Sequence, residues 1–182
     1  MSEAADVVYH VDARDELVFV NPQWDRFASE NDGQAFLSHL VLGRPLWDFI
    51  ADITTRQLYR DMLARVRAGR ALTFPLRCDS PDMRRSLSMR ATPLDARAVA
   101  FTVRTLETQP RPGVRLLAAE GERRGAPLRM CGWCRKVDVE GAWLEIEDAV
   151  ARLGLFDAPQ PPLTHGICAD CEAQLDRTIG AP

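Results

Sequence analysis

The chain has 182 residues and a mass of 20.4 kDa, enough for one ordinary domain with a small appendage or for two small domains. Hydrophobic residues make up 46% and charged residues 27%, which excludes a chain that is disordered throughout. The formal net charge of −3 is too small to indicate a polyanionic partner.

From the sequence we expect neither a membrane span nor a secretory signal. No apolar run is long enough to cross a bilayer, and residues 1–6 are acidic and lack an apolar stretch. We therefore expect a cytoplasmic protein that makes no membrane contact. Of the five cysteines, Cys78 stands alone and the other four form two pairs in the last third of the chain. In a chain without a signal peptide, paired cysteines more often bind metal than form disulfides.

The first part of the chain begins with a predicted β-hairpin. Val7–Val11 and Leu17–Val20 are rich in β-branched and aromatic residues and are separated by a short polar turn. Asn21 and Pro22 then have the residue types that begin a helix. Asparagine caps free backbone N–H groups, and proline at the first helical position has no N–H to leave unpaired.

A longer helix is predicted from residue 54 onward. Thr54 and Gln57 have the spacing of a capping box, and Gly69 stands where a helix-ending glycine is expected. Apolar residues recur on one face of this segment at Leu58, Met62 and Val66.

Three strands should follow this helix, over residues 72–78, 86–92 and 99–106, with turn residues between them. The order is then two strands, a helical block and a three-strand meander. The fold class predicted for this part is α+β, with one five-stranded antiparallel sheet covered on one face by helices.

This order resembles the PAS sensory fold over about residues 6–107. The matching residues are Phe19-Val20-Asn21 at the end of the hairpin, Trp24 and Phe27-Ala28 in the next helix, and the run Gly43 to Ile50. The resemblance implies a sensory or protein-interaction module that is often dimeric and sometimes holds a ligand between sheet and helices. A homodimer and an unidentified PAS ligand are therefore expectations.

Two PAS chemistries do not fit the residues. Flavin photoreceptors of the light-oxygen-voltage kind resemble Gly43-Arg44 but need a reactive cysteine two residues later, where this chain has Pro45-Leu46-Trp47. Haem-binding PAS domains usually offer a histidine on the long helix, and residues 54–68 contain none. His10 and His39 are better interpreted as ordinary histidines.

A polar cluster surrounds the loop that follows residue 77. One hypothesis is an anion or partner contact made by its arginines. The simpler one is a turn closed by the Asp79 and Ser80 side chains, with solvated arginines around it. Cys78 is interpreted as a small strand residue, because no catalytic set accompanies it. The arginines concerned are Arg77, Arg84 and Arg85.

Residues 108–128 have the glycine- and proline-rich composition of a linker. We accordingly predict a PAS-like domain over residues 1–107 and a small zinc-bound, helix-containing subdomain over residues 129–182. Within the linker, Val114–Leu117 is expected to form a short strand or a helical turn that docks on the first domain.

The second part carries two Cys-x-x-Cys pairs that can supply four thiolates to one tetrahedral Zn²⁺. The gap of 33 residues between the pairs is long, and a helix over residues 143–153, ended by Gly154, is expected to fill it. Alternatives are two dithiols or a redox disulfide pair. The predicted ligands are Cys131, Cys134, Cys168 and Cys171.

Several neighbours of the cysteines support a structural ion. Four thiolates with Zn²⁺ leave two negative charges, which Arg129, Arg135 and Lys136 lie close enough in sequence to offset. A segment of this size has little core of its own, so a metal ion would stabilise it. His165 is expected to support the site as a hydrogen-bond donor or as part of the turn, since four cysteines already complete the shell.

The string His165-Gly166-Ile167-Cys168 resembles a cysteine-rich segment found beside receiver or PAS modules in bacterial signalling proteins. With the first part, it implies a non-enzymatic signalling module that acts through ligand-dependent or partner-dependent protein interaction.

A redox- or zinc-responsive switch that uses the same thiolates is the main alternative. Nucleic-acid binding is disfavoured because the C-terminal part is net acidic and carries Glu145, Glu147 and Asp148 in its helix. An enzyme is the least favoured class, because four cysteines fill the zinc shell and no glycine-rich phosphate loop is present. Asp48 and Asp52 are interpreted as helix-start and loop residues.

Overall fold

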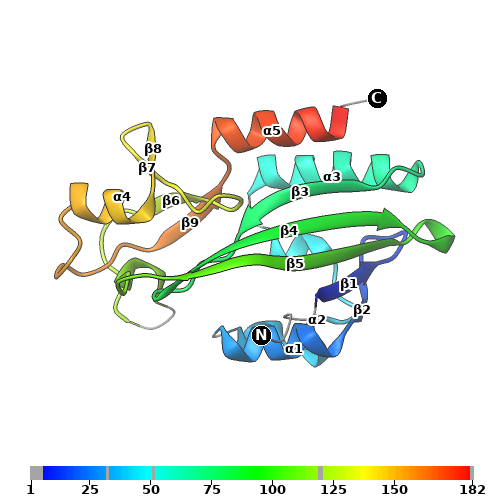
Figure 1. The fold of residues 1–182 in the computed structure, drawn as a ribbon, viewed down its shortest axis with the longest axis horizontal. Helices are drawn as coiled ribbons and strands as arrows, with labels where there is room; N and C mark the ends of the chain where they lie inside the picture. The colour runs from blue at the N-terminus through cyan, green and yellow to red at the C-terminus, as the bar shows by residue number, and fades with distance from the viewer. Residues whose placement is uncertain (1–5, 32, 51, 119–120, 181–182) are drawn as a thin grey trace.

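The computed structural model describes residues 6–31, 33–50, 52–118 and 121–180 (Figure 1). The first five residues of the acidic opening segment lie outside this range. The fold is α+β, as predicted, with a five-stranded antiparallel sheet and a second, mixed sheet of four strands. In the part of the chain that is described, no helix has the length and apolar character needed to span a membrane.

The five-stranded sheet has the strand order β2-β1-β5-β4-β3. The helical block lies between β2 and β3 in the chain. Its helices are α1 (Pro22–Glu30), α2 (Ser38–Val41) and α3 (Ile53–Arg67), with 3₁₀ turns over Gln34–Phe36 and Leu46–Phe49. The strands are β1 (Val7–Val11), β2 (Leu17–Val20), β3 (Leu72–Arg77), β4 (Met83–Pro93) and β5 (Val99–Pro110).

Of the two helix starts predicted from the sequence, the start of α1 is confirmed and the start of α3 is wrong. Asn21 caps α1, and its side-chain oxygen accepts a hydrogen bond from Trp24 N at 3.3 Å. In α3 the cap is Asp52, whose carboxylate accepts from Thr55 N at 2.6 Å, so the predicted Thr54 capping box is wrong. A carboxylate also suits the positive end of the helix dipole, and it begins the helix earlier than expected. Gly69 ends α3 with a φ of +101°, as predicted.

The last two strands are longer than predicted. Their antiparallel pairing runs from Pro93 opposite Val99 to Met83 opposite Pro110, with an irregularity between Ser86 and Leu87. The extension is mostly polar, so a hydrophobic pattern does not mark it as strand, and the cross-strand pairing holds it. It carries the β4–β5 hairpin towards the second sheet (Figure 1).

The main core lies between α3 and one face of the five-stranded sheet. Alternate residues of neighbouring strands point to this face, and Tyr9 stacks on Phe101 with ring centroids 4.7 Å apart. The predicted apolar stripe of α3 is buried against them. Buried side chains in this core include Tyr9, Leu58, Met62, Val66, Phe74, Met89 and Phe101.

The second sheet has the order β8-β7-β6-β9, and β6 pairs parallel with β9 and antiparallel with β7. The helices of this part are α4 (Ile146–Arg152) and α5 (Ala169–Gly180). The strands are β6 (Leu128–Cys131), β7 (Val137–Val139), β8 (Ala142–Leu144) and β9 (Leu163–Gly166).

A hairpin replaces the start of the helix predicted over residues 143–153. Glu140 and Gly141 both have positive φ, +55° and +88°, which closes a tight turn between β7 and β8. Trp143 therefore lies in a strand, and α4 begins at Ile146. Gly154, with a φ of +65°, follows the end of the helix as predicted.

The linker contributes to the core of the second sheet. Residues 115–117 form a 3₁₀ turn, so of the two predicted forms the helical one is confirmed. Val114 and Leu116 are buried with Met130, Val137 and Ile146, while Val114 N donates to Pro81 O of the first part at 2.8 Å. The turn thus contacts both parts of the chain.

The helix cap of α3 gives a first test. We expect Asp52→Ala to lower the free energy of unfolding by about 1 kcal/mol, because Thr55 N loses its acceptor. Thr54→Ala is the matched control and should have a smaller effect. Urea denaturation followed by circular dichroism measures both, and a larger loss in the Thr54 variant would contradict this assignment of the cap.

Candidate metal centre

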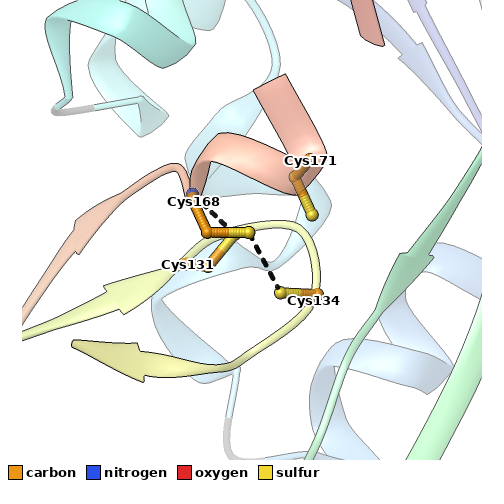
Figure 2. Close-up of side chains that lie close together, drawn as sticks. All are labelled: Cys131, Cys134, Cys168 and Cys171. Atoms are coloured by element: carbon orange, nitrogen blue, oxygen red, sulfur yellow. Dashed lines mark hydrogen bonds between the residues drawn. The ribbon is translucent and has the colours of Figure 1, made fainter. Parts of the chain in front are cut away.

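The first cysteine pair lies on a tight turn between β6 and β7. Cys131 N donates to Lys136 O at 2.8 Å, and Arg135 N donates to Cys131 O at 3.0 Å. Arg135 has a φ of +63°, a backbone conformation that is uncommon for residues other than glycine. The turn brings Cys131 and Cys134 to the same side of the backbone (Figure 2).

The second pair lies at the junction of β9 and α5. Cys168 directly precedes the helix and Cys171 is in its first turn, where backbone N–H groups and the helix dipole favour negative charge. Cys168 N donates to the sulfur of Cys131 at 3.4 Å. The two junctions are also linked directly, because Gly132 N donates to Gly166 O at 2.8 Å.

The four sulfur atoms form a compact cluster in which all lie within 4.8 Å of one another. The sulfurs of Cys134 and Cys168 are 3.7 Å apart, much farther than the ~2.0 Å of a disulfide bond. A regular tetrahedron with metal–sulfur bonds of ~2.3 Å has edges of ~3.8 Å. The arrangement therefore fits a tetrahedral ion, and Figure 2 shows the four side chains converging from the two junctions.

The electrostatics of the cluster favour a cation. The pKa of the Cys131 thiol lies far below its usual range because its sulfur is hydrogen-bonded by Cys134 and Cys171. The hydrogen bond with Cys131 raises the pKa of Cys134 to about 12, and the same interaction raises that of Cys171. One thiolate thus opposes ionisation of its neighbours, and a divalent ion removes this conflict by binding all four as thiolates.

The burial of the cysteines is consistent with a structural metal. Cys131 and Cys168 are 0% and 1% exposed, while Cys134 and Cys171 are half-buried. Four protein sulfurs complete a tetrahedral shell, whereas a catalytic zinc keeps one position for water or substrate. Soft thiolate ligands favour zinc among common divalent ions.

The residues near the cysteines take different roles. Arg129 pairs with Asp138 at 2.7 Å and lies over the Trp143 ring, and Arg135 Nε donates to Arg77 O at 3.2 Å. His165 lies in β9, where much of the residue is open to solvent. Desolvation of the covered part of its ring lowers its pKa, and the positive charge of Arg135 lowers it further. Its supporting role at the site stays a prediction.

Two arginines of the cluster in the first part are paired rather than solvated. Arg77 forms an ion pair with Glu145 at 2.7 Å, and Arg84 forms one with Glu147 at 3.1 Å. The simpler sequence hypothesis is right about the Asp79 turn, since Arg85 N donates to Asp79 at 3.3 Å, but wrong about Arg77 and Arg84. Their partners belong to the same chain.

The remaining candidates lie away from the cluster. Cys78 follows the end of β3, and its backbone N donates to Arg85 O at 3.1 Å. His10 packs against Phe19, with ring centroids 4.5 Å apart, and burial lowers its pKa. His39 lies in α2.

Trp133 is the important residue that sequence reasoning did not single out. It lies between the two cysteines of the first turn and is only 7% exposed. Its ring packs against Tyr59 and Phe74 of the first part, with centroids 5.5 Å and 6.3 Å apart. A large apolar residue inside a four-residue metal turn is the one sequence signal that could have indicated this contact.

Comparison with protein-family models gives no match, and comparison with curated proteins gives none either. The interpretation of the site therefore depends on its geometry and on the sequence.

Metal content tests the cluster directly. We expect about one zinc ion per purified chain, and a large loss of zinc in Cys131→Ser because three thiolates no longer complete the shell. Cys78→Ser is the matched control and should keep its zinc. Elemental analysis of the three proteins measures the ratio, and full zinc content in Cys131→Ser would contradict the assignment.

Proposed function

We propose that this chain is a non-enzymatic sensory or interaction module of the PAS kind, with a structural zinc ion in its C-terminal segment. The observation that carries the proposal is the combination of an antiparallel five-stranded sheet, a helical block inserted between β2 and β3, and a closed four-sulfur cluster. The first two features agree with the architecture that the PAS resemblance implies.

The residues of the resemblance have structural roles that support it. Gly43 has a φ of +79°, which favours glycine, and its N–H donates to Leu17 O at 2.7 Å. Leu17 N in turn donates to Arg44 O at 2.9 Å. These two hydrogen bonds tie the turn at Gly43-Arg44 to the start of β2. The positive φ of Gly43 is the reason why glycine is favoured in this turn.

The carboxylates considered for catalysis have structural partners. Asp48 pairs with Arg44 at 3.0 Å, and Asp52 caps α3. The four cysteines supply a full shell of ligands to one ion. These observations favour a module that acts by binding rather than by catalysis.

Charge pairing disfavours a nucleic-acid interface at the arginine cluster. Phosphate contacts require arginines that are free to exchange counterions. Glu145 and Glu147 instead neutralise Arg77 and Arg84. We propose that the module acts on protein partners, with a homodimer as the simplest assembly.

Native mass spectrometry with an absorbance scan of the same sample tests this proposal. We expect the mass of the chain or its dimer plus one zinc per chain, with no visible absorbance band. Residues 54–68 lack the histidine of haem-binding PAS domains, and residues 45–47 lack the reactive cysteine of flavin photoreceptors. A haem or flavin band would contradict this expectation and identify a ligand sensor. A chain mass without zinc would contradict the proposed metal site.

The redox-switch alternative differs in its response to oxidant. Cys134 and Cys171 are half-buried, and oxidation of two thiolates by hydrogen peroxide would form a disulfide and release zinc. For a closed structural site we expect zinc content to stay unchanged under mild peroxide that oxidises added glutathione in the same sample. Rapid zinc release, followed with a chromogenic chelator, would instead favour the switch.

A further inference from the structure

The turn that carries the first cysteine pair reaches out of its own segment and into the core of the first part. Trp133 belongs to the same hydrophobic cluster as Phe74 and Met62, and so do Cys131 and Cys168. Burial of a tryptophan contributes more apolar contact area than that of most other residues. The side chain between the metal ligands therefore acts as an anchor on the five-stranded part.

The same turn covers the end of an edge strand. β3 is the outermost strand of the five-stranded sheet, so one side of it has no neighbouring strand in that sheet. Arg77 N donates to Trp133 O at 2.7 Å, and Arg135 Nε donates to Arg77 O at 3.2 Å. The backbone N–H and C=O of Arg77 thus both form hydrogen bonds with residues of the turn that carries Cys131 and Cys134. These bonds cover the end of β3 at the open edge of the sheet.

Helix α5 extends this contact from the other cysteine pair. It lies alongside α3 and next to β3 (Figure 1). Leu175 and Ile179 are buried in the shared cluster, and Arg70 donates to Thr178 O at 3.4 Å. The helix that directly follows Cys168 therefore covers the face that α3 and β3 form.

Ion pairs fix the orientation of the two parts. Arg77 and Arg84 of the first part pair with Glu145 and Glu147 at the start of α4. Arg111 bridges the two sides, with Glu147 at 3.2 Å and the fully buried carboxylate of Asp79 at 3.3 Å. Buried and partly buried charges of this kind give an interface its specific register.

These contacts reach the first part from two pieces of chain that pair along β6 and β9 and whose ends meet at the four sulfurs. The anchor Trp133 lies on the first piece, and the covering helix α5 begins at the second. The structure assigns the metal a docking role: the ion joins the Trp133 turn to α5, and together they form a surface whose partner is the α3–β3 face of the same chain. Loss of the ion releases this surface and uncovers that face.

This inference rests on the proposed zinc site, and hydrogen exchange on the full chain tests it. In zinc-loaded protein the peptides of β3 and α3 should be protected. After chelation, and in zinc-loaded Trp133→Ala, we expect loss of protection at Arg77 and along α3, while β1 and β2 keep theirs. The Trp133→Ala variant retains all four cysteines, so it should bind zinc and still undock.

Two controls separate docking from general damage. Trp133→Phe keeps an aromatic ring at the anchor and should preserve protection of β3. Phe156→Ala removes an aromatic ring that is 63% exposed and should have no effect on β3.

Zinc content, measured on every sample, separates failure of the inference from failure of the metal site. If the wild-type protein contains zinc but β3 and α3 stay protected after chelation, the docking inference is wrong and the zinc site still stands. Equal loss of protection in β1 and β3 would also overturn it, because the ion would then stabilise the whole fold. A wild-type chain that is protected at β3 without any zinc would overturn both proposals.

Discussion

Four sulfur atoms within 4.8 Å of one another impose a charge constraint on the C-terminal part. Without a cation, the interaction with Cys131 raises the pKa of Cys134 and Cys171, so ionisation of one sulfur opposes ionisation of its neighbours. A divalent ion at this cluster would bind all four sulfurs as thiolates and would link two pieces of chain that lie far apart in sequence. In the proposed docking role of the metal, the placement of Trp133 and of α5 against the first part depends on this junction.

The interface between the two parts combines three kinds of interaction that differ in range. The Trp133 side chain supplies apolar burial, the backbone of Arg77 supplies directional hydrogen bonds, and the Glu145–Glu147 region supplies charge. Apolar contact is not directional, so it stabilises many orientations. The hydrogen bonds and ion pairs select one of them.

The sequence was most informative where local chemistry decides the structure. Asn21-Pro22, the stripe on α3 and the Cys-x-x-Cys pairs each act within a few residues. The α+β class with a five-stranded antiparallel sheet follows from the strand patterns and their order along the chain. Two errors are local, since Asp52 rather than Thr54 caps α3 and the Glu140–Gly141 turn converts expected helix into strand. The other errors lie where distant residues decide. The polar ends of β4 and β5 are held by each other. The pairing of Arg77 with Glu145 joins residues that no local pattern relates.

The shared core restricts how this chain can be divided or recombined. Residues 108–128 have the composition of a linker, yet Arg111 and Val114 within it contact both parts. A fragment that ends before residue 111 would lack Trp133 and would expose the sides of Tyr59 and Phe74 that pack against its ring. If the cysteine segment were grafted onto another protein, that protein would need a surface that accepts the indole ring of Trp133. Substitutions at Trp133, Tyr59 and Phe74 should therefore be constrained together, even though these residues belong to stretches that look independent along the chain.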